Sequence, residues 1–73
     1  MTKEELIAAI KSGNITEELV DAFVDFEWDF DPYGVLDAWG HPDEPEVREA
    51  MRKDVRYTLI NNPEDALYYL TEE

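Results

Sequence analysis

Residues 45–59 read PEVREAMRKDVRYTL and carry the clearest helical pattern in the chain. Proline suits the first turn of an α-helix, so Pro45 marks a helix start. One set of side chains then recurs at spacings of three and four, which places them on a single helix face. The sequence therefore predicts an amphipathic helix from about Pro45. The residues on the predicted face are Val47, Ala50, Met51, Val55, Thr58 and Leu59.

Four other segments carry helix start and stop signals. Thr2 with Glu5 forms a capping-box pattern, and Gly13 suits the position after a helix end, which predicts a helix over about 3–12. Thr16 opens a second helix that runs to about residue 27 or beyond, and its apolar stripe includes the position of Glu27. Segments 32–39 and 63–70 each begin with a proline that follows Asp31 or Asn62, which suits a cap followed by a first helical residue.

Residues 26–30, FEWDF, also alternate between apolar and acidic side chains, so a short strand remains an alternative there. We favour a helix because the apolar stripe of the preceding residues continues through this segment. Residues 1–73 are thus expected to form one all-α domain, a small bundle of four or five short helices.

The composition is strongly acidic. The 73 residues include 19 Asp and Glu against 6 Lys and Arg, with a net charge of -13 and no cysteine. Such a surface repels phosphates, so we expect no direct binding to nucleic acid or to an anionic membrane, and a basic partner instead. No stretch approaches the ~20 apolar residues of a membrane span. We expect a monomeric cytoplasmic protein, because this charge opposes self-association.

Acidic side chains form a row along the second predicted helix. Glu17, Asp21, Asp25 and Asp29 are spaced by four residues, which places successive carboxylates about 6 Å apart on one side. Each such like-charge pair costs a few tenths of a kcal/mol, so folding alone does not explain the row. Two interpretations stay open: a solvated face that keeps the protein soluble, or a surface for a basic partner.

Arginines form a second row, at Arg48, Arg52 and Arg56. This row could hold a phosphate, or it could pair with acidic residues of the same chain. We favour pairing with the second helix or with the acidic ends of the chain, because the rest of the protein has a surplus of carboxylates.

Catalysis and metal binding find little support in the sequence. His41 is the only histidine and Ser12 the only serine, so no set of nucleophile, base and orienting group can be assembled. Residues 29–40 match part of a calcium-binding loop, but Tyr33 and Gly40 stand where two of its oxygen ligands should be. We therefore expect no enzyme activity, no cofactor and no specific metal site.

The segment 21–34, DAFVDFEWDFDPYG, combines acidic and aromatic side chains. With this segment, its small size and its acidity, the chain resembles the short acidic phage proteins that block host defence, the anti-restriction and anti-CRISPR inhibitors, some of which are DNA mimics. The resemblance implies a non-catalytic inhibitor, acting in the host cytoplasm if phage-encoded, that occupies a basic nucleic-acid-binding protein. The residues expected to bind that partner are Glu17, Asp21, Asp25, Trp28, Asp29, Asp31 and Tyr33.

Two alternatives stay open beside this interpretation. One is an interaction or assembly module that uses an exposed aromatic patch of Trp28, Tyr33, Trp39, Tyr68 and Tyr69. The other is an immunity-type nuclease inhibitor, because residues 65–69, DALYY, resemble the acidic, tyrosine-paired segment of those proteins. No site residue is assigned on that second resemblance.

Overall fold

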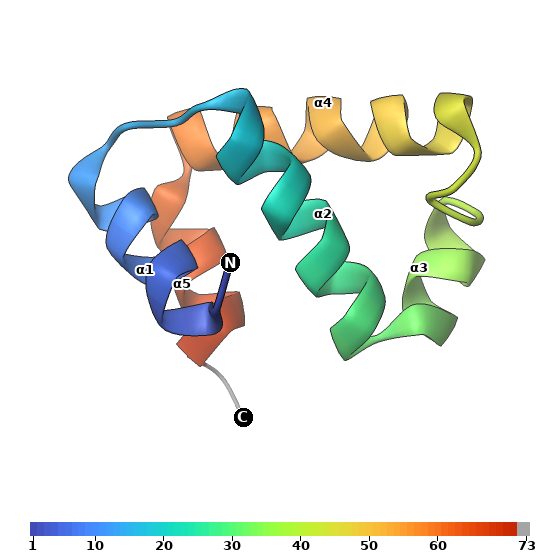
Figure 1. The fold of residues 1–73 in the computed structure, drawn as a ribbon, viewed down its shortest axis with the longest axis horizontal. Coiled ribbons are helices and arrows are strands. Elements are labelled where there is room, and N and C mark those ends of the chain that lie inside the picture. Colours follow the sequence, from blue (N-terminus) through green and yellow to red (C-terminus); the bar gives the residue numbers. More distant parts are fainter. Residues whose placement is uncertain (72–73) are drawn as a thin grey trace.

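The computed structural model describes residues 1–71, which fold into helices joined by short connections (Figure 1). The five helices are α1 (Lys3–Ser12), α2 (Glu17–Phe30), α3 (Pro32–Ala38), α4 (Pro45–Asn61) and α5 (Pro63–Thr71). The described residues contain no strand. The predicted all-α fold class is confirmed, and residues 26–30 are helical.

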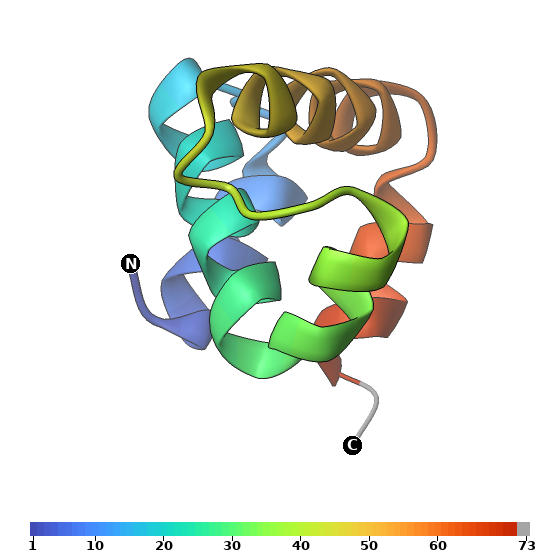
Figure 2. The ribbon, with the colours of Figure 1, turned by 90° about the vertical axis from the view of Figure 1, so that its right-hand side faces the viewer.

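The longest helix, α4, runs along one edge of the molecule, and the other four lie on one side of it (Figures 1 and 2). Helix α2 packs against α4 and α1, while α5 packs against α1 and α4. The short helix α3 packs mainly against α2. One end of the molecule therefore consists of α3, the last turn of α2 and the first turn of α4.

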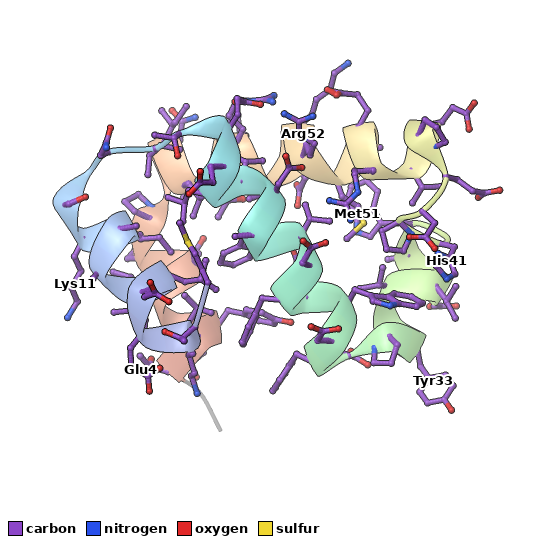
Figure 3. All side chains as sticks on the ribbon, in the orientation of Figure 1. Glu4, Lys11, Tyr33, His41, Met51 and Arg52 are labelled. Carbon is purple, nitrogen blue, oxygen red and sulfur yellow. The ribbon has the colours of Figure 1, made fainter. Side chains whose placement is uncertain are left out.

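The core takes apolar side chains from all five helices, among them Met51, which points inward from α4 (Figure 3). No polar or charged residue of the described part is buried. The apolar stripes predicted from the spacing supply most of this core, but Phe30 and Ala50, which the spacing places on these stripes, are exposed. The core residues are Leu6, Ile10, Leu19, Val20, Phe23, Val24, Val35, Met51, Val55, Leu59, Ala66 and Leu70.

Side-chain caps fix the starts of three helices. At α1 the Thr2 hydroxyl accepts from the Glu5 amide, and the Glu5 carboxylate accepts from the Thr2 amide, which completes the predicted capping box. Thr16 accepts from the Leu19 amide at the start of α2. These bonds satisfy amides that a helix leaves without partners, so each supports the predicted boundary.

The third cap explains an unexpected glycine. Asp31 Oδ1 accepts from the Gly34 amide and caps α3. A Cβ atom at residue 34 would lie 2.2 Å from Asp31 Oδ2, so a larger side chain would displace the capping carboxylate. Glycine is a poor helix former, but at residue 34 it leaves the space that the capping carboxylate of Asp31 occupies.

Candidate binding surfaces

Three arginines of α4 form ion pairs with three acids of α2. Arg48 Nη2 lies 2.7 Å from Asp25 Oδ1, and its Nη1 lies 3.4 Å from Asp21 Oδ1. The same guanidinium donates through Nε to the Pro42 carbonyl. Arg48 thus joins α2, α4 and the segment before α4.

The row continues toward the start of α2. Arg52, labelled in Figure 3, contacts Glu17 through Nη2, and its Nε lies 3.3 Å from Asp21 Oδ1. That Nε is buried and has no hydrogen-bond partner among the described residues, so the contact with Asp21 is electrostatic only. Arg56 Nε and Nη2 donate to the two oxygens of Glu17 at 2.9 and 2.6 Å. The predicted pairing between the arginine row and the second helix is confirmed.

These contacts change the pKa values of Glu17, Arg48 and Arg56. Hydrogen bonds from Arg56 and then Arg52 lower the pKa of Glu17 to about 2. The pKa of Arg48 is raised chiefly by its hydrogen bond to Asp25, and that of Arg56 by its hydrogen bonds to Glu17. Glu17, Asp21 and Asp25 are therefore neutralised locally by arginines, although all three remain accessible from solvent.

A different group of carboxylates has no such counter-charges. Residues 29–46 contain six acids and no lysine or arginine. All six are exposed, and none forms an ion pair with a lysine or arginine of residues 1–71. They lie around α3, and we call this surface the acidic end. Its carboxylates belong to Asp29, Asp31, Asp37, Asp43, Glu44 and Glu46.

Large apolar side chains project from the same end. Tyr33 is 83% exposed and points away from α3 (Figure 3). Leu36 and Trp39 are 45% and 40% exposed, so only Val35 of α3 is fully buried. The acidic end therefore combines carboxylates that lack a lysine or arginine partner with accessible aromatic surface, including Asp29, Asp31 and Tyr33 of the residues expected from the sequence.

Trp28 lies differently from Tyr33. Its side chain is partly buried against the core, and its ring centroid lies 4.5 Å from that of His41. His41 Nδ1 accepts from the Asp43 amide at 3.2 Å and lies 3.7 Å from Oδ2 of the Asp43 carboxylate. The Trp28–His41 contact packs the segment before α4 against α2.

The aromatic residues of the alternative interaction patch differ in exposure. Tyr33, Trp39 and Tyr68 are exposed, whereas Trp28 and Tyr69 pack against the core. The Tyr69 ring lies 6.0 Å from that of Phe23 and 5.6 Å from that of Phe30, between centroids.

Glu27 is a carboxyl group to which the sequence assigns no function. It is partly buried on α2, and burial, followed by the charge of Asp54, raises its pKa to about 7. The only sequence signal is that Glu27 shares the stripe of Phe23 and Phe30, a position where an apolar residue is expected. A carboxyl group there is desolvated, which makes its charged form unfavourable.

No protein-family model, curated protein or solved structure matches this chain. Among residues 1–71, no helix has both the length and the apolar character needed to cross a membrane. The same residues bring together no group of three acidic or histidine side chains suited to a metal ion.

Proposed function

We propose that this protein is a non-catalytic inhibitor that blocks a basic nucleic-acid-binding protein, such as a host defence nuclease or a CRISPR effector. The acidic end takes the place of nucleic acid on that protein. The observation that carries the proposal is the set of six exposed carboxylates around α3, in a segment without a single lysine or arginine.

Charge pairing distinguishes the acidic end from the first turns of α2. A basic partner that approaches Glu17, Asp21 or Asp25 must compete with Arg48, Arg52 and Arg56, or be repelled by them. At the acidic end it meets carboxylates whose charge is uncompensated. Complementary charges of this kind accelerate association and select basic partners.

Tyr33 supplies a second contribution. Aromatic side chains at the centre of a charged interface often contribute much of the binding free energy. Tyr33 lies near Asp31 in the chain and is the most exposed large hydrophobic residue of the described part. The resemblance to small acidic phage inhibitors agrees with this arrangement and supports the choice of partner class.

The observations also favour a second candidate, an interaction module that binds through apolar surface. Three large side chains in and directly after the seven-residue helix α3 are exposed, namely Tyr33, Leu36 and Trp39. Binding of that kind survives moderate salt, because burial of apolar area is not screened by ions. Salt dependence therefore separates the two candidates.

Affinity capture from host lysate at low salt tests the proposal. Bound proteins are eluted by stepwise salt, and in parallel by double-stranded DNA, with neutral dextran as the control competitor. We expect a nucleic-acid-binding protein that elutes with salt and with DNA but not with dextran. A partner that resists salt and ignores DNA would contradict nucleic-acid mimicry and support the interaction module.

A further inference from the structure

A cavity of about 150 Å³ lies between α2, α4 and α5. Apolar and aromatic side chains form most of its wall, and three carboxyl groups from three helices complete it. None of the lining residues is basic. They are Phe23, Glu27, Asp54, Val55, Thr58, Leu59, Asp65, Ala66 and Tyr69.

The three carboxyl groups have different surroundings. Asp54 on α4 and Asp65 on α5 are exposed, whereas Glu27 on α2 is partly buried. Glu27 forms no ion pair or hydrogen bond with any side chain of residues 1–71. The cavity therefore has an uncompensated carboxyl group in its apolar wall and two more acids in its lining.

A second cavity, of about 200 Å³, shares Glu27 and Tyr69 with the first. It is lined on its other side by residues of the α3 region, including Asp31 and Trp39, and again by no basic residue. Glu27 thus lies where the first cavity borders the acidic end. The second cavity thus brings Glu27 together with Asp31, a residue of the acidic end.

We propose that the cavity between α2, α4 and α5 binds an alkylammonium group, supplied by a lysine side chain of the basic partner. The ammonium pairs with the Glu27 carboxylate, with Asp54 and Asp65 adding to the attraction. The aliphatic part packs on Phe23 and Leu59. The assignment of the ammonium group to a lysine of the partner rests on the proposed function. Binding of an alkylammonium group in the cavity does not.

Size and chemistry both fit this ligand. A protein cavity of about 150 Å³ is large enough to bind benzene, and the butylammonium end of lysine has fewer non-hydrogen atoms. Aromatic faces attract cations, so Phe23 and Tyr69 suit the positive end as well as the chain. An anion would meet three carboxyl groups without a basic residue to balance them.

Binding should depend on pH through Glu27. The groups that face it are Asp54 from α4, Asp65 and Tyr69 from α5, and Asp31 at the start of α3. Tyr69 stays protonated, because burial and the charges of Glu27 and Asp31 raise its pKa to about 12. Only ionised Glu27 attracts the cation fully, so affinity should fall about tenfold between pH 8 and pH 6 around its pKa of about 7.

A nuclear magnetic resonance titration of the isotope-labelled protein with n-butylammonium tests the proposal. The neutral control ligand is n-butanol, which has the same carbon chain. We expect saturable shifts at the lining residues with n-butylammonium only, at about pH 8. Glu27→Gln should weaken binding at least about tenfold, whereas the matched variant Glu18→Gln, at an exposed acid of the same helix outside the cavity, should leave it unchanged.

Three results would overturn the proposal: equal shifts with n-butanol, shifts spread over the whole acidic surface that Glu27→Gln does not reduce, or tighter binding of ethylguanidinium than of n-butylammonium. Asp54→Asn gives a second variant, with an intermediate loss expected. The titration contains no partner protein, so its failure would leave the proposed inhibition to be decided by the capture experiment. Failure of the capture experiment would likewise leave ammonium binding to be decided by the titration.

Discussion

Arg48 on α4 and Asp25 on α2 form an ion pair in which Nη2 and Oδ1 are 2.7 Å apart. Their pairing shows that the acidic row of α2 is part of the fold as well as of the surface. Three of its four acids contact arginines of α4. Asp29, the fourth acid, forms no ion pair with these arginines. The acid that continues the row therefore belongs to the acidic end.

Removing the Arg48 side chain should lower the free energy of unfolding by about 1 kcal/mol, because exposed ion pairs contribute ~0–1 kcal/mol and its bond to the Pro42 carbonyl is lost as well. Urea denaturation of Arg48→Ala measures this. The control is Lys53→Ala, which removes the same charge from an exposed residue of α4 without a described ion pair. Equal losses of unfolding free energy in the two variants would contradict a specific contribution of the Arg48 contacts and show an effect of net charge alone.

Glu17 should make the protein sensitive to acid. Its folded pKa of about 2 lies below the ordinary value of 4.5, so its stabilising effect is complete above about pH 4.5 and disappears as the pH falls toward 2. Thermal unfolding between pH 5 and pH 2 should therefore show a smaller loss of stability for Glu17→Gln than for the wild type. Parallel curves for the two proteins would contradict the ion pairs of Arg52 and Arg56 with Glu17.

Glu27 should have the opposite effect. Its folded pKa of about 7 lies above 4.5, so the folded state binds the extra proton and stability falls as the pH rises from about 4.5 through 7. At about pH 8, Glu27→Gln should raise the free energy of unfolding by up to about 3 kcal/mol, while near pH 4 the two proteins should be alike. Urea denaturation at both pH values measures this; a destabilised variant at pH 8 would contradict the burial of Glu27.

Gly40 should tolerate substitution less well than Gly13. Both have positive φ, at 118° and 79°, but a Cβ at residue 40 would lie 3.1 Å from Val47 Cγ2, whereas residue 13 has open space. Gly13→Ala should cost about 1 kcal/mol and Gly40→Ala more, as measured by thermal unfolding. Similar costs would show that the segment between α3 and α4 adapts easily.

Most of the fold can be predicted from local patterns. Caps at Thr2, Thr16 and Asp31, and prolines at residues 32, 45 and 63, mark helix starts because they act on neighbouring amides alone. Periodicity predicts the buried stripes for the same reason. Residues 26–30 are ambiguous because alternation and helical spacing overlap in so short a segment, and packing against Tyr69 supports the helix.

The candidate surfaces are less predictable, because they depend on which helices meet. The sequence shows an acidic row and an arginine row, but the pairing of Asp25 with Arg48 follows only from the packing of α2 on α4. The exposure of Tyr33 and the partial burial of Trp28 likewise depend on the position of α3 and of His41. No local motif distinguishes Glu27 in the sequence, because the residues that surround its carboxyl group come from α4 and α5.

The most direct test of the proposed inhibition compares the affinity of two triple variants for the captured partner at low salt. One carries Asp29→Asn, Asp31→Asn and Asp37→Asn at the acidic end, and the second of these changes retains a side-chain oxygen for capping α3. The control carries Glu4→Gln, Glu18→Gln and Glu64→Gln, which remove the same charge at exposed sites outside that end. We predict a loss of at least about tenfold for the first and less than about threefold for the second. Equal losses, or none, would contradict the role of the acidic end.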